Sequence, residues 1–159
     1  MKASEKAAAY LAGGMKSELQ VRQYLARKGY SEDECDEAVE ELKEYHFIDD
    51  YAYAVEYFRS GFARKRGERR IRRELEEKGI TGEPVEAALR ELEAEGDVPD
   101  EYEQAMEVAS SVTRDYTPEE MEAMDFATKQ KLRGRIVRRL GGRGFSGDVS
   151  YRVAKELVK

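Results

Sequence analysis

Cations at helical spacing are the feature of this sequence best suited to chemistry with a partner. Lys131, Arg135 and Arg139 follow one another at intervals of four residues, and no acidic side chain stands between positions 126 and 147. Residues four apart share one helix face, and like charges there destabilise the helix by about a few tenths of a kcal/mol per pair. We therefore expect this stripe to bind acidic protein surface or nucleic-acid phosphate. Arg138 and Arg143 are further candidates.

A second group of cations lies between positions 64 and 73. Within it, Arg70, Arg72 and Arg73 each have a glutamate four residues on, so ion pairs along a solvated helix face are an alternative explanation for them. Arg64, Lys65, Arg66 and Arg69 have no such partner, and Arg69 and Arg73 should lie opposite the apolar face. The candidate partner- or nucleic-acid-binding residues are Arg64, Lys65, Arg66, Arg69, Arg73, Lys131, Arg135 and Arg139.

The residue types needed for catalysis are scarce. His46 is the only histidine and Cys35 the only cysteine, so a metal cluster or a Cys/His pair is hardly available. The sequence has no phosphate-binding loop and no dinucleotide fingerprint. The acidic pair Asp49-Asp50 is better explained by Asp50 capping a helix. We predict a protein that is not an enzyme and uses no metal or other cofactor.

The composition favours thin helical modules over a thick globular core. Of 159 residues, 40% are hydrophobic and 39% charged, so narrow apolar stripes must face broad solvated surfaces. No apolar run approaches the roughly 18 to 20 residues that span a bilayer, and the first residues lack the apolar core of a secretory signal. One cysteine cannot form an internal disulfide. We expect a cytoplasmic monomer that does not associate with membranes.

The net charge of −6 conceals an uneven distribution. Residues 59–79 carry a net charge of +5 and residues 129–159 one of +8, whereas residues 80–125 carry −13. An acidic protein is a poor candidate for indiscriminate coating of DNA, but local basic blocks can still dock on an anionic partner.

A repeated motif organises the chain. Each copy reads Leu, two residues, a cation, Gly, a large apolar residue and then Ser or Thr, and a Val or Ile stands one helical turn before the Leu. The copies begin at Leu25, Leu75 and Leu140. This pattern predicts a helix that ends at a left-handed glycine, followed by a hydroxyl cap of the next helix.

The predicted fold is all-α, with three tandem three-helix repeats that form an elongated, curved helical array. We expect repeats at residues 1–48, 49–98 and 99–159. The predicted helices span residues 3–12, 17–28, 31–45, 50–63, 67–78, 82–95, 100–113, 118–140 and 146–158, and Asp125 is the point where the eighth could break. Aromatic residues such as Tyr51, Phe58, Phe62, Tyr30 and Phe47 are expected to pack in the core, whereas Tyr53 and Tyr57 are candidates for exposed contacts.

The ordered motifs resemble the RecX family. The segment from Lys16 to Tyr30 resembles its first repeat, Phe47 to Ala54 its Asp-Asp turn into a helix, Gly67 to Ile80 its second repeat, and Arg143-Gly144-Phe145-Ser146 the turn of its third. The match covers nearly the whole chain, and four motifs in order are far more specific than any one. Gly141-Gly142 and the strongly acidic stretch 83–125 depart from the family pattern.

The resemblance implies a bacterial regulator, mainly an inhibitor, of the recombinase and coprotease activities of RecA. It would lie in the groove of the RecA nucleoprotein filament and so modulate DNA recombination, DNA repair and the SOS response, without catalysis. The alternative is a helical repeat protein that binds single- or double-stranded DNA directly through phosphate contacts. That alternative requires tight DNA binding without RecA and a steep loss of affinity with salt. A helical adaptor for some other partner is a third hypothesis.

Overall fold

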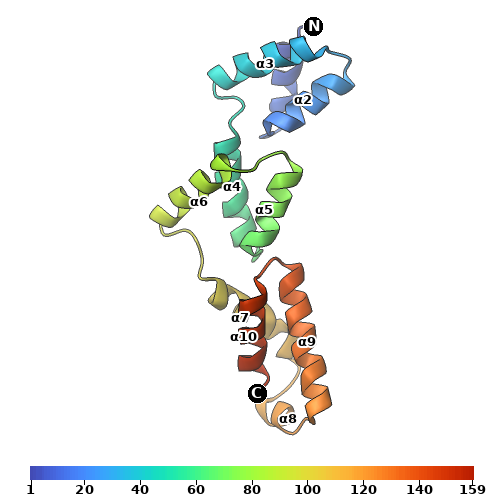
Figure 1. The fold of residues 1–159 in the computed structure, drawn as a ribbon, viewed down its shortest axis with the longest axis vertical. Helices are drawn as coiled ribbons and strands as arrows, with labels where there is room; N and C mark the ends of the chain where they lie inside the picture. The colour runs from blue at the N-terminus through green and yellow to red at the C-terminus, as the bar shows by residue number, and fades with distance from the viewer. The chain divides into compact units, whose positions relative to one another are not determined.

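The computed structural model describes residues 1–159 as helices joined by short turns, with no strand (Figure 1). The helices are α1 (Ala3–Leu11), α2 (Glu18–Arg27), α3 (Glu32–Glu44), α4 (Asp50–Ala63), α5 (Glu68–Glu77), α6 (Glu83–Ala94), α7 (Glu101–Thr113), α8 (Pro118–Glu122), α9 (Phe126–Gly142) and α10 (Gly147–Leu157). The all-α prediction is confirmed. The predicted eighth helix is divided into α8 and α9, and α9 runs two residues past the predicted end at position 140.

The start of most helices follows from a polar side chain that caps it. Ser17 and Ser31 form capping boxes, in which each hydroxyl accepts the amide three residues on and the side chain there returns to the serine amide. Ser146 caps α10 by accepting from the amide of Val149. The break before α9 occurs at Asp125, as predicted, because its carboxylate accepts from the Thr128 amide at 2.7 Å and starts a new helix.

The repeated glycine turn has the geometry that the sequence predicts. In all three copies the glycine has a positive φ, and the amide of the next residue donates to the leucine carbonyl five positions earlier. This is the C-terminal bond pattern that a left-handed glycine permits. The glycines are Gly29, Gly79 and Gly144. The six repeat positions that precede them are completely buried, and they are Val21, Leu25, Ile71, Leu75, Ile136 and Leu140.

The chain divides into two compact units, each described separately. Unit 1 comprises residues Met1–Tyr57 and Glu74–Ala94, and unit 2 comprises Phe58–Arg73 and Glu95–Lys159. This grouping differs from the three repeat boundaries expected from the sequence, which stay a prediction.

Each unit has its own apolar core. In unit 1, α1, α2 and α3 pack around the buried residues Ala7, Val21, Leu25, Val39 and Ile48. In unit 2, α7, α9 and α10 pack around the buried residues Ala105, Leu132, Ile136, Phe145 and Val153.

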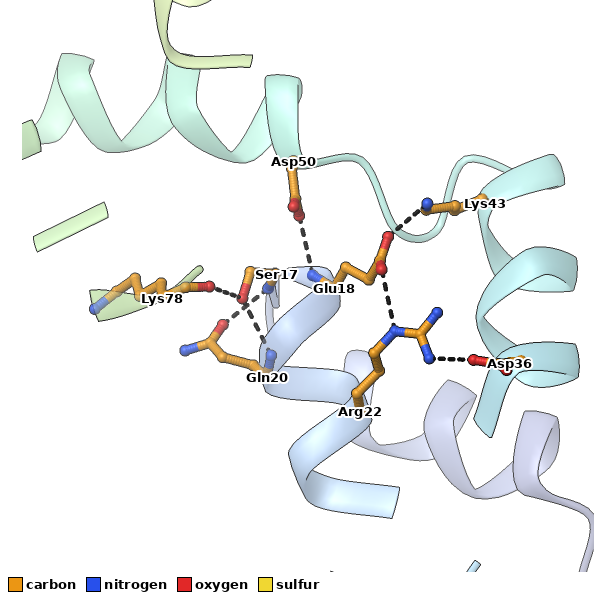
Figure 2. Close-up of polar contacts among 8 residues, drawn as sticks. All are labelled: Ser17, Glu18, Gln20, Arg22, Asp36, Lys43, Asp50 and Lys78. Carbon is orange, nitrogen blue, oxygen red and sulfur yellow. Dashed lines mark hydrogen bonds and ion pairs between the residues drawn. The ribbon is translucent and has the colours of Figure 1, made fainter. Parts of the chain in front are cut away.

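Polar contacts at the start of α2 hold unit 1 together (Figure 2). The completely buried Ser17 donates its hydroxyl to the carbonyl of Lys78 at 2.7 Å. Asp50 accepts the backbone amide of Glu18 at 2.9 Å, and the Glu18 carboxylate binds Lys43 and Arg22 at 2.5 and 3.0 Å. The first turn of α2 is therefore tied to α3, α4 and the end of α5.

The expected capping role of Asp50 is wrong, because its neighbour takes that role. Asp49 accepts the amide of Ala52 at 3.1 Å, three residues on, as an N-cap does. Asp50 is the first residue of α4, so its side chain is free to satisfy the first amide of α2 instead.

The expectation that aromatic residues pack in the core holds only in part. Phe58 and Phe62 are buried, with their ring centroids 5.7 Å apart. Phe47 is 62% exposed and Tyr51 36% exposed, so core packing is wrong for these two. Phe47 lies in a turn, and the Tyr51 hydroxyl donates to Glu91. The candidate exposed pair Tyr53 and Tyr57 is half-buried and stacked, at 6.0 Å between centroids.

Candidate anion- and partner-binding surface

Two glycine turns of unit 2 are in direct contact. The amide of Gly67, just before α5, donates to the carbonyl of Arg143, just after α9, at 2.7 Å. A Cβ on Gly67 would lie 2.3 Å from the backbone carbonyl of Gly144, and a Cβ on Gly144 would lie 2.4 Å from the Cβ of Arg70. The two backbones can approach this closely only because both positions lack a side chain.

Arg143 fastens these turns together. Its Nε donates to the carbonyl of Lys65 at 3.2 Å and its Nη2 to the carbonyl of Arg64 at 2.5 Å. One guanidinium thus holds the backbone of the first basic group, 78 and 79 positions away in sequence. Because its donors bind backbone carbonyls rather than a carboxylate, the positive charge of Arg143 is not neutralised there.

The two basic groups predicted from the sequence converge at Arg143. Burial lowers the pKa of the Arg143 guanidinium, and the positive charges of Arg139, Arg70 and Arg66 lower it further. Arg139 belongs to the second basic group and Arg66 to the first. The positive charges of both groups therefore act on the Arg143 guanidinium.

Two residues of the first basic group, Lys65 and Arg72, form ion pairs that were not expected from the sequence. Arg64, Arg69 and Arg73 are exposed, and Arg66 is half-buried. Lys65, which has no glutamate four residues on, forms an ion pair with the distant Glu107 at 2.8 Å.

Arg72 also forms an ion pair with a residue earlier in its helix. Arg72 binds Glu68, four residues before it, at 2.9 Å. The Glu-before-Arg order is the more favourable of the two on a helix, because it agrees with the helix dipole.

The second basic group lies along α9 as expected. Lys131, Arg135 and Arg139 are exposed, and no acidic side chain forms an ion pair with any of them. From Lys131 to Arg139 the stripe extends about 12 Å at the rise of an α-helix. Its Arg139 end adjoins Arg143, so the structure brings together one end of the stripe and the turn before α5.

Sequence reasoning treated Arg143 as a minor candidate and missed its central position. The available signal was the Arg-Gly pair that occurs at Arg66-Gly67 and again at Arg143-Gly144. Glycine at both turns permits the close backbone approach, and the arginine beside each glycine then lies near the contact.

No cluster of His, Cys, Asp and Glu could hold a metal ion. Cys35 is buried, and burial raises the pKa of its thiol, so it is a poor nucleophile. His46 lies exposed in a turn. None of the helices combines the length and hydropathy that crossing a membrane requires.

Fold and surface together define an all-helical protein with exposed cations on unit 2. Residues 3–42 match the first three-helix domain of RecX and residues 49–89 match the second. The chain belongs to the RecX family. The third repeat turn, which contains Arg143 and Gly144, lies outside these two matched segments.

Curated relatives extend the similarity over almost the whole chain. The chain is 29% identical to regulatory protein RecX of Clostridium botulinum (strain Eklund 17B / Type B) over 158 residues, which cover 99% of this chain and 69% of the relative. It is 26% identical to regulatory protein RecX of Listeria monocytogenes, of which the match covers 54%. The names of these relatives assign a regulatory role to the family.

Solved structures show the same fold. The chain superposes on the crystal structure of RecX from Lactobacillus salivarius with a TM-score of 0.77 and 23% identity, over 98% of this chain and 94% of that one. A second crystal structure, of regulatory protein RecX, gives a TM-score of 0.76 and 26% identity, over 98% and 72% of the two chains.

Proposed function

We propose that this protein regulates RecA by binding the RecA–DNA filament along its groove, mainly as an inhibitor of recombinase and coprotease activity. Membership of the RecX family is the observation that carries the proposal. Through this binding the protein would modulate DNA recombination, DNA repair and the SOS response. It acts without chemistry of its own, in a cytoplasm where the filament forms.

The cationic surface of unit 2 supports a partner with negative charge. Unit 2 holds 19 basic and 14 acidic residues, whereas unit 1 holds 9 and 20, so the units carry net charges of +5 and −11. A nucleoprotein filament presents both phosphates and acidic side chains. Complementary charge speeds association and makes it sensitive to salt.

Direct binding to DNA is the second candidate function. The convergence of Arg139 and Arg66 around Arg143 favours it, because closely spaced arginines are suited to phosphate. This function requires that the protein binds naked DNA and that the logarithm of its affinity falls linearly with the logarithm of the salt concentration.

The two functions are separated by measuring the ATPase of RecA on single-stranded DNA while this protein is titrated in. Binding of the protein to the same DNA without RecA is followed in parallel. We expect the ATPase to fall at concentrations too low to coat the DNA. Heat-denatured protein at the same concentrations is the control for non-specific inhibition.

An unchanged ATPase at micromolar excess would contradict the proposed function. If that result came with strong, salt-sensitive binding to naked DNA, the second function would replace the first.

A further inference from the structure

A groove lies between α9 and α10 in unit 2. Its volume is about 690 Å³, within the range of sites that bind ligands. It is lined by Gln130, Arg133, Gly134, Val137, Arg138, Tyr151, Ala154 and Lys155.

The lining combines positive charge with apolar surface and contains no acidic residue. Arg133 and Arg138 come from α9 and Lys155 from α10, so both helices contribute cations. The lining also includes Val137 and the ring of Tyr151, which is 62% exposed. Neither Arg138 nor Lys155 forms an ion pair within the chain. A ligand with carboxylates on either side of an apolar group would complement this lining.

Gly134 has no packing reason to be a glycine. It lies inside α9, where glycine is less favourable than alanine. A Cβ there would meet only the Arg138 guanidinium, at 3.2 Å from Nη1 and 4.0 Å from Cζ. The missing side chain therefore leaves the groove open and lets the guanidinium lie over the helix.

Arg133 is already held in place before any ligand binds. Its Nε donates to the carbonyl of Val158 at 2.7 Å, and its Nη1 donates to the Gln130 amide oxygen at 3.0 Å. Nη2 makes no hydrogen bond within the chain and remains as a donor. A side chain fixed in advance loses less conformational entropy when it binds a ligand.

We propose that this groove binds an acidic segment of a partner protein. A large apolar side chain of the segment packs against Tyr151 and Val137, and flanking carboxylates bind Arg138 and Lys155. Single-stranded nucleic acid fits less well, because such sites stack successive bases on several aromatic rings and this groove has one. This binding site goes beyond the proposed function and does not depend on it, since the groove is formed by this chain without RecA or DNA.

The test uses the full chain and fluorescent synthetic peptides in which one variable central residue is flanked on both sides by glutamates. Binding is followed by fluorescence anisotropy. We expect the tightest binding with a large apolar central residue and a loss of about tenfold in the double variant Arg138→Ala/Lys155→Ala, which removes two charge-assisted contacts. The matched control, Lys2→Ala/Arg27→Ala, changes the net charge equally at exposed positions of unit 1 and should lose less than about twofold.

Gly134→Ala separates a binding role from a structural one. The added methyl group favours the helix and meets only the flexible end of Arg138, so thermal unfolding should move to higher temperature. The same methyl group fills part of the groove, so peptide affinity should fall about threefold or more. Tighter folding with weaker binding is not expected of a purely structural position.

Four results would overturn the proposal. The first is that no peptide binds with a Kd below about 100 μM. The second is that the control pair loses as much affinity as the groove pair. The third is that oligothymidylate binding, rather than peptide binding, is lost when Arg138 and Lys155 are replaced. The fourth is that self-association of the chain is lost in the same variant, which would assign the groove to a second copy. RecA is absent throughout, so failure here leaves the proposed function unaffected.

Discussion

Glu18 shows how opposing electrostatic effects act on one carboxylate. Partial burial by itself would raise the pKa of Glu18, but the hydrogen bonds and charges of Lys43 and Arg22 together lower it. At neighbouring Asp50 burial prevails and raises the pKa, although the Glu18 amide donates to its carboxylate. The carboxylates of Glu18 in α2 and Asp50 in α4, which meet at the start of α2, therefore contribute to stability with opposite dependence on pH.

We predict that Glu18→Gln lowers the free energy of unfolding by about 1 kcal/mol at about pH 7, since the ion pairs are partly exposed and screened. A carboxylate with a lowered pKa stabilises the fold above its unfolded-state pKa of 4.5. This contribution is lost as the pH falls through the lower pKa of the folded state. The difference between the two proteins in urea unfolding should thus shrink toward about pH 3. An equal difference at both pH values would show that the effect is not electrostatic.

At the scale of elements, the contact between two turns determines where the cations of unit 2 lie. The start of α5 and the end of α9 meet at Gly67 and Gly144, and Arg143 binds the backbone of Arg64 and Lys65. The residues of α5 and α9 determine where each helix begins and ends, but the contact between the two turns determines the distance between their basic groups.

Gly67→Ala should destabilise the protein by about 1–3 kcal/mol, because the new Cβ would collide with rigid backbone rather than with a flexible side chain. Gly141→Ala is the control: no atom lies within 4 Å of its added Cβ, and the substitution favours α9 by up to about 1 kcal/mol. Thermal and urea unfolding of both variants would check these opposite signs. A neutral Gly67→Ala would mean that the turns can separate without loss.

At the scale of the whole molecule, charge is divided between the two compact units, and the unpaired stripe on α9 is part of the positive one. Ion pairs within the chain already neutralise several cations, such as Lys65 with Glu107 and Arg59 with Glu95 and Asp97. Lys131, Arg135 and Arg139 are exposed without such partners, so they remain available to an anionic surface.

Reversing that stripe by Lys131→Glu, Arg135→Glu and Arg139→Glu should weaken inhibition of the RecA ATPase by about tenfold or more, as close charge pairs across an interface do. Helix content by circular dichroism should stay unchanged because the three side chains are exposed. The matched control reverses Lys2, Lys6 and Arg27 of unit 1, an equal change in net charge. Equal inhibition by wild type and the folded stripe variant would exclude the stripe as the contact surface.

Local features of this chain were predictable because they depend on residues close in sequence. The capping boxes at Ser17 and Ser31, the left-handed Gly29 and the buried Val21 and Leu25 all follow from hydrogen bonds or helical period within a few residues. The break at Asp125 also follows locally, because its carboxylate caps the start of α9, the helix that follows it in sequence.

The sequence by itself determined the all-helical class, the repeat turns and the presence of two basic groups, since these depend on composition and spacing. Only the tertiary structure decided that Arg143 joins the two groups, that Glu107 pairs with Lys65, and that Asp50 serves α2 rather than its own helix. These contacts join residues 78, 42 and 32 positions apart. Their partners are selected by how helices pack and by where glycine allows backbones to touch, and neither is encoded in local spacing.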